Sequence, residues 1–89
     1  MGNFIGGSAQ AMVRQVSEGY LLVTERNFKR LQRGDLDQLA FEIEKLLREI
    51  RGDQPDLEDR EAIQIRNRRI QRLNTCRMML RTYRQRRRV

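Results

Sequence analysis

The sequence predicts an all-α protein built around an antiparallel helical hairpin, and three observations lead to this fold class. Apolar residues recur at helical spacing in three successive stretches, 9–33, 35–51 and 57–86. Segments punctuated by glycine or proline separate these stretches, and no segment shows the alternating pattern of a strand. The last two stretches are expected to form the hairpin, and the first either packs on it or extends its first helix. The expected architecture is a small three-helix bundle or an elongated two-helix bundle, with 9–89 as a single helical domain.

The N-terminal segment 1–8 contains three glycines and little that a core would bury, so we expect a flexible tail. It ends at Ser8, a residue typical of an N-cap. The first helix is predicted over 9–33. Gly19 lowers the helix propensity in the middle of this stretch and marks the point at which the helix would break. The apolar side chains of the stretch are spaced by three, four or eight residues and are Met12, Val16, Tyr20, Val23 and Leu31.

The second helix, over 35–51, has the most regular amphipathic pattern in the chain. Gly34 is typical of the residue just after a helix, and Asp35 is predicted as the N-cap of the next one, with Gln38 completing a capping box. The apolar face predicts the surface that packs against the last helix. It carries Leu36, Leu39, Ala40, Ile43, Leu46, Leu47 and Ile50.

A chain reversal is predicted between the second and third stretches. Gly52 follows the end of one helix, Pro55 cannot continue it, and Asp56 is predicted as the N-cap of a helix beginning at Leu57. That helix is expected to run to about Arg86. Because the connection is short, the two helices are expected to lie antiparallel. The apolar seam of the last helix consists of Ile63, Ile70, Leu73, Cys76, Leu80 and Tyr83.

Charge is distributed very unevenly along the chain, whose formal net charge is +7. Residues 62–89 carry ten arginines and no acidic residue, whereas residues 35–61 carry ten acidic and four basic side chains. Residues 1–34 contribute five basic and two acidic side chains. A strongly basic last helix favours a partner with negative charge, such as phosphate, an acidic protein surface or an anionic lipid. A solubilising end that binds nothing is the plainer alternative.

The hairpin geometry predicts which arginines the acidic middle of the chain neutralises. If the turn is centred in the middle of the reversal, Arg66 lies opposite Glu42 and Arg72 lies opposite Asp35. The arginines from Arg77 onward then have few carboxylates opposite them. This prediction depends on the first helix continuing the line of the second, and it fails if the first helix folds back on the hairpin.

Composition argues against an enzyme, a metal site and a small-molecule substrate. Histidine, the commonest general base and metal ligand, is absent. The single cysteine, Cys76, cannot form an intrachain disulfide, so the protein is expected in a reducing cytoplasm. No cofactor is expected. The carboxylates of 53–61 lack the spacing of a calcium loop.

The sequence therefore predicts a non-enzymatic protein–protein interaction or adaptor module that self-associates and contacts an acidic partner. Sequence-nonspecific nucleic-acid binding through the same arginines is the alternative, and the pattern does not favour a membrane surface. The residues expected to contact the anionic partner are Arg77, Arg81, Arg84, Arg86, Arg87 and Arg88. The apolar seam or interface is expected to be formed by Leu73, Leu80, Tyr83, Ile63 and Ile70. Apolar surface that a lone hairpin would leave uncovered is expected at Leu21, Leu22, Phe41 and Met78.

Overall fold

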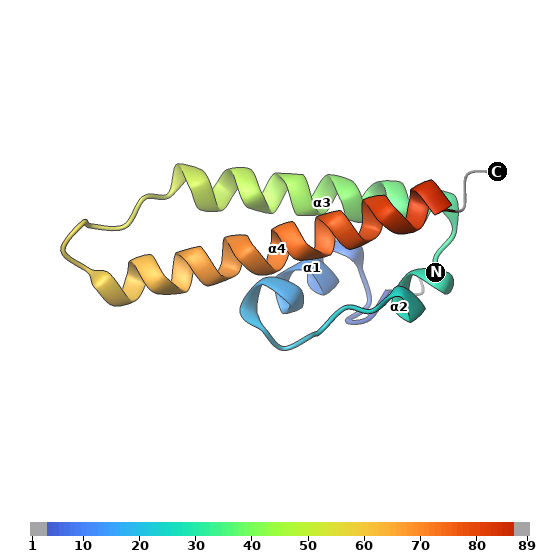
Figure 1. Cartoon of the computed structure of the whole chain (residues 1–89), viewed down its shortest axis with the longest axis horizontal. Helices are drawn as coiled ribbons and strands as arrows, with labels where there is room; N and C mark the ends of the chain where they lie inside the picture. The colour runs from blue at the N-terminus through green and yellow to red at the C-terminus, as the bar shows by residue number, and fades with distance from the viewer. Residues whose placement is uncertain (1–3, 87–89) are drawn as a thin grey trace.

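The computed structural model describes residues 4–86, which form four α-helices arranged as a long hairpin with a smaller N-terminal unit on one side (Figure 1). Helices α3 (Arg33–Gly52) and α4 (Arg60–Arg86) run antiparallel and make the hairpin. Helices α1 (Ala9–Glu18) and α2 (Glu25–Lys29) lie along α4. The molecule measures 48 × 26 × 20 Å, and the predicted all-α fold class is confirmed.

The predicted helix over 9–33 is wrong in its length, because the chain leaves the helix at Gly19. Ser8 caps the start, since its hydroxyl accepts a hydrogen bond from the Ala11 amide at 3.1 Å. Gly19 takes a left-handed conformation with φ 85°, and its amide bonds back to carbonyls of the last turn. After residues 20–24, a new short helix, α2, starts behind Thr24.

Helix α1 folds back onto the hairpin and does not extend α3. It contacts both α3 and α4, and its side chains Met12 and Val13 are fully buried between them. Of the predicted tail, residues 1–3 lie outside the described part of the chain, Phe4 is buried in the core, and residues 5–8 are exposed. Of the two predicted placements of the first helix, the structure therefore shows the packed one.

Helix α3 begins two residues earlier than predicted. Its capping box is shifted, because the Asp35 carboxylate accepts a hydrogen bond from the Gln32 amide at 3.0 Å. Gly34 consequently lies inside the first turn and not after the end of a preceding helix. The predicted apolar face is confirmed, and its buried residues are Leu36, Leu39, Ile43, Leu46, Leu47 and Ile50.

Helix α4 begins three residues later than predicted. Asp59, and not Asp56, caps it, because the Asp59 carboxylate accepts from the Ala62 amide at 3.0 Å. Asp56 instead holds a turn by accepting from the Glu58 amide at 3.1 Å. Because α4 has 27 residues and α3 has 20, α4 reaches beyond the end of α3, and residues 53–59 span the difference (Figure 1). We call residues 53–69 the projecting end.

The core lies where α1, α2, α3 and α4 meet, away from the projecting end. The rings of Phe28 in α2 and Tyr83 in α4 pack against each other with centroids 5.5 Å apart. The first α4 residue to be buried is Leu73, and Ile63 and Ile70 are only partly buried. The fully buried large side chains are Met12, Val13, Phe28, Leu39, Ile43, Leu47 and Leu73.

Candidate functional site: the arginines of helix α4

Three arginines in the distal half of α4 form ion pairs inside the fold. Arg77 Nη1 lies 2.9 Å from Glu44 Oε1, and Arg84 pairs with Asp37, both carboxylates belonging to α3. Arg86 Nη2 lies 2.8 Å from Oε1 of a third carboxylate, on α2. These arginines therefore have part of their charge satisfied within the chain, and a partner would have to compete for them.

The predicted register of the hairpin is wrong, and with it the predicted division between neutralised and free arginines. Arg77 pairs with Glu44, although the sequence placed it beyond the acids of α3. The reason is that α4 reaches well beyond the end of α3, so the residues of α3 that face α4 are displaced by about four helical turns from the predicted pairing. Arg66 and Arg72, expected to be neutralised, make no ion pair with any residue in 4–86.

Arg72 has a different role, which sequence reasoning missed. Its Nη1 donates a hydrogen bond to the backbone oxygen of Ser17 at 3.2 Å, near the C-terminus of α1. A Cβ on Gly19 would lie only 2.9 Å from the Arg72 Cζ, so the guanidinium packs directly on the glycine. The free carbonyls at a helix C-terminus attract cations, and the C-cap at Gly19 was the sequence signal for such a contact.

Five arginines of α4 have side chains without an ion pair or hydrogen bond among the described residues, and we call them the unpaired arginines: Arg60, Arg66, Arg68, Arg69 and Arg81. Arg68 and Arg81 are exposed. Arg66 and Arg69 are partly covered, and the Nε of each is buried without a hydrogen-bond partner in the described structure. Their terminal guanidinium nitrogens are the part of each side chain left to meet an anion. Four of the five unpaired arginines, all except Arg81, lie in the projecting end.

The six arginines predicted to contact an anionic partner thus divide into three groups. Arg77, Arg84 and Arg86 are paired with carboxylates. Arg81 is exposed and unpaired. Residues 87–88 lie outside the described part of the chain.

The predicted apolar seam lies mostly inside the fold. Leu73, Leu80 and Tyr83 are buried against the other helices, which leaves them no surface for a partner, whereas Ile63 and Ile70 are partly buried. Of the residues predicted to remain uncovered, Leu21 packs partly against the core. The exposed large apolar side chains are Ile5, Tyr20, Leu22, Phe41, Leu57, Ile65 and Met78.

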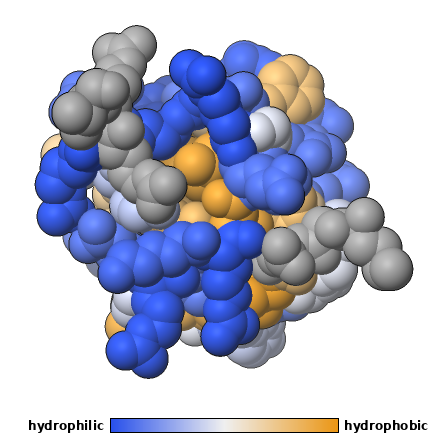
Figure 2. Space-filling view, turned by 90° about the vertical axis from the view of Figure 1, so that its right-hand side faces the viewer, coloured by the Kyte–Doolittle hydropathy of each residue, from blue (hydrophilic) through white to orange (hydrophobic). Residues whose placement is uncertain are grey.

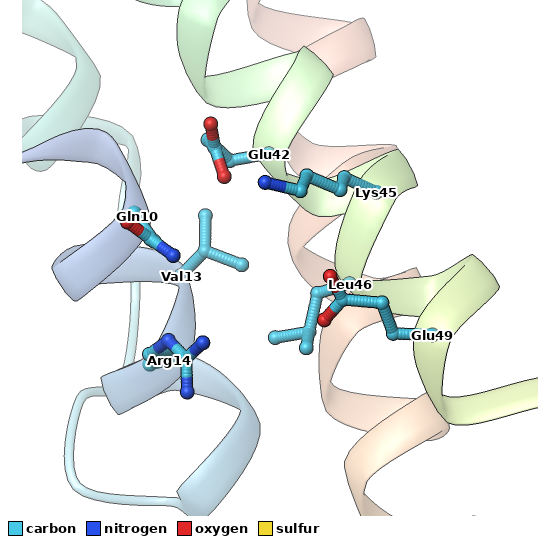
Figure 3. A pocket seen from close by; sticks show the side chains of 7 residues that line it. All are labelled: Gln10, Val13, Arg14, Glu42, Lys45, Leu46 and Glu49. Carbon is cyan, nitrogen blue, oxygen red and sulfur yellow. The ribbon is translucent and has the colours of Figure 1, made fainter. Parts of the chain in front are cut away.

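A shallow groove between α1 and α3 has a free volume of only about 10 Å³, roughly the space of one water molecule (Figure 3). Charged side chains edge it, but it has no room for a small-molecule substrate. Within residues 4–86, no cluster of three or more acidic, histidine or cysteine side chains is placed to hold a metal ion. The lining residues are Gln10, Val13, Arg14, Glu42, Lys45, Leu46 and Glu49.

The thiol of Cys76 is an unreactive group. It is unpaired and only 3 % exposed, and burial raises its pKa from 9.0 to about 11. Thiolate is the nucleophilic form, so a thiol with this pKa is almost fully protonated near neutral pH. Cys76 therefore serves as a small apolar side chain in the core.

The outer surface and the comparisons with known proteins give no further assignment. Viewed from the end at which α4 finishes, the surface is mostly hydrophilic around an apolar centre (Figure 2). Every helix within residues 4–86 is too short or too polar to cross a lipid bilayer.

No protein-family model matches the chain, and neither a curated protein nor a solved structure matches it.

Proposed function

We propose that the protein is a non-enzymatic interaction module that self-associates and binds an acidic protein surface through the unpaired arginines of α4. The observation that carries this proposal is the contrast along one helix. Arg77, Arg84 and Arg86 already have carboxylate partners, whereas the unpaired arginines have none within residues 4–86. Guanidinium groups suit this role because each presents several donors in a planar fork that matches a carboxylate.

The burial of the side-chain stems supports a binding role for part of this set. Arg66 and Arg69 have buried Nε atoms, so their stems are already held against the protein. A side chain that is partly ordered before binding loses less conformational entropy when it meets a partner. Arg66 and Arg69 lie less than one turn apart along the helix and about 60° apart around it, so their guanidinium groups can meet the same partner.

Nucleic-acid binding is the second candidate, and a specific feature of α4 favours it. Besides Met78, the exposed outer face of the helix is lined by uncharged polar side chains between the arginines. Amide and hydroxyl groups of this kind contact phosphates and base edges. Stacking on single-stranded bases is not favoured, because Tyr83 is buried against Phe28. The polar residues of this face are Gln64, Asn67, Gln71, Thr75, Thr82 and Gln85.

Binding to two defined probes separates these candidates. We expect a fluorescent polyglutamate peptide to bind at about 50 mM salt and to be released as salt rises, with weaker binding to a duplex DNA of similar charge. Tighter binding to the duplex would favour the nucleic-acid function instead. Binding of neither probe at this salt concentration would contradict the anion-binding part of the proposal.

We also propose a reducing, cytoplasmic location. The support is the single cysteine, Cys76, which is buried and unpaired.

A further inference from the structure

One side of α4 is covered by α1 along only part of its length. Arg72 marks the limit of this cover, because its guanidinium packs on Gly19 at the end of α1. From Leu73 onward α4 buries side chains in the core, whereas none of its residues from 60 to 72 is fully buried. The same side of the helix therefore continues into the projecting end without a partner.

Three residues line this uncovered side: Glu61, Ile65 and Arg68. They fall within about 60° of one another around the helix, and Arg72 falls in the same sector. Ile65 is 49 % exposed, and Glu61 and Arg68 are exposed and make no ion pair or hydrogen bond with the described residues. An apolar side chain thus lies between an acid one turn before it and a base one turn after it.

This arrangement is self-complementary in charge. When two identical helices lie antiparallel and cross at Ile65, Glu61 of each copy comes opposite Arg68 of the other. A two-fold interface requires such a relation, because each contact must occur twice with the roles of the two copies exchanged. A partner of uniform negative charge would match Arg68 but would be repelled by Glu61.

We propose that a second copy of this chain docks antiparallel on this side of α4, with the two-fold axis near Ile65 and reciprocal Glu61 and Arg68 pairs. The proposal rests on the self-association in the proposed function and names the surface through which the two copies associate. In the dimer, the α4 of the second copy packs on one side of α4 near its N-terminus. Nearer the C-terminus of α4, α1 covers the same side. Tyr20 and Leu22, which are 81 % and 88 % exposed, follow Gly19 at the margin of this surface and add apolar contact.

The charge of the projecting end supports the same partner. Residues 53–59 contain four acidic side chains and no basic one, whereas residues 62–69 contain three arginines and no acid. In the antiparallel dimer, each acidic loop lies toward the arginines of the other copy. Long-range attraction between these segments would speed encounter and would weaken as salt is added.

Sedimentation equilibrium over a concentration series tests this proposal through charge reversal. We expect a dimer for the wild type, and for Glu61→Arg alone or Arg68→Glu alone a dimer dissociation constant raised roughly tenfold or more, because each change creates two like-charge contacts. The variant carrying both reversals restores the pairs and the dimer, and an equal mixture of the two single variants forms a heterodimer. Arg48→Glu, an exposed reversal on α3, is the matched control and leaves the dimer intact.

The outcomes separate this surface from the broader function. A wild type that stays monomeric at every concentration overturns both this interface and self-association. A dimer that persists unchanged in both single variants overturns this interface alone and leaves self-association standing. Circular dichroism of each variant shows whether the helices are retained, and Ile65→Lys provides a second disruption if Glu61→Arg weakens the first turn of α4.

Discussion

Arg72 Nη1 donates a hydrogen bond to the backbone oxygen of Ser17, 3.2 Å away and 55 residues earlier in the chain. The contact joins the end of α1 to the middle of α4, and the guanidinium packs on Gly19. The positively charged guanidinium satisfies a carbonyl at a helix C-terminus, where the partial negative charge of the helix dipole favours a cation. This relationship sets where α1 stops and where the uncovered side of α4 begins.

Replacing Gly19 with alanine is expected to destabilise the protein by about 1–3 kcal/mol. The left-handed backbone, at φ 85°, is unfavourable for a residue with a Cβ, and that Cβ would lie 2.9 Å from Arg72 Cζ. Urea denaturation monitored by circular dichroism measures the change. Gly34→Ala is the matched control, because a Cβ there meets nothing within 4 Å in the first turn of α3, so we expect no loss of stability. Equal losses in the two variants would contradict the contact at Gly19.

Replacing Asp59 with alanine is expected to cost about 1 kcal/mol, because its carboxylate caps the amide of Ala62 at the start of α4. Asp56→Ala should cost less, since that side chain only bonds within the loop, to Glu58. The free energies of unfolding of the two variants measure the difference. A larger loss for Asp56→Ala would place the start of α4 where the sequence predicted it.

The ion pair between Arg77 and Glu44 is expected to contribute only about 0.2–1 kcal/mol, because the two side chains are 33 % and 45 % exposed. A double-mutant cycle with Arg77→Gln and Glu44→Gln isolates the coupling energy. We expect the coupling to shrink at about 1 M salt. No coupling at low salt would show that Arg77 is as free as Arg81.

The stability of the protein is expected to fall in alkaline solution because of Cys76. Burial raises the pKa of its thiol from 9.0 in the unfolded chain to about 11 in the fold. Below pH 9 both states hold the proton and the stabilisation is fully present, whereas between about pH 9 and 11 the unfolded chain releases the proton first and stability is lost. The full effect is on the order of 2–3 kcal/mol.

Urea denaturation at a series of pH values measures this loss, and Cys76→Ala should flatten it while lowering stability at neutral pH by leaving a cavity. An identical alkaline loss in the alanine variant would assign it to other groups. A disulfide reagent should likewise react with the native protein far more slowly than with the unfolded chain.

Local patterns predicted the helices of the hairpin well, because amphipathic spacing reports directly on burial. The apolar face of α3 and the buried positions Leu73, Leu80 and Tyr83 follow from spacing alone. Ser8 was also recognisable as a cap from its residue type and position.

The register of the hairpin was not predictable in the same way. It depends on how far α4 reaches beyond the end of α3, which the spacing of apolar residues within each helix does not report. This reach places Glu44 beside Arg77 and changes which arginines are paired. The fold-back of α1 depends on a contact between residues far apart in the chain, which spacing within a helix does not report.

Two matched double variants test most directly whether partner binding uses the unpaired arginines of α4. Arg69→Gln with Arg81→Gln removes two unpaired arginines, and Arg77→Gln with Arg84→Gln removes two paired ones; each pair includes one arginine with a buried Nε. The measurement is the affinity for the fluorescent polyglutamate peptide at about 50 mM salt. We expect the first variant to lose more affinity and keep its stability, and the second to lose less affinity but unfold at lower urea concentration. An equal or greater loss of affinity in the second variant would contradict the assignment of binding to the unpaired arginines.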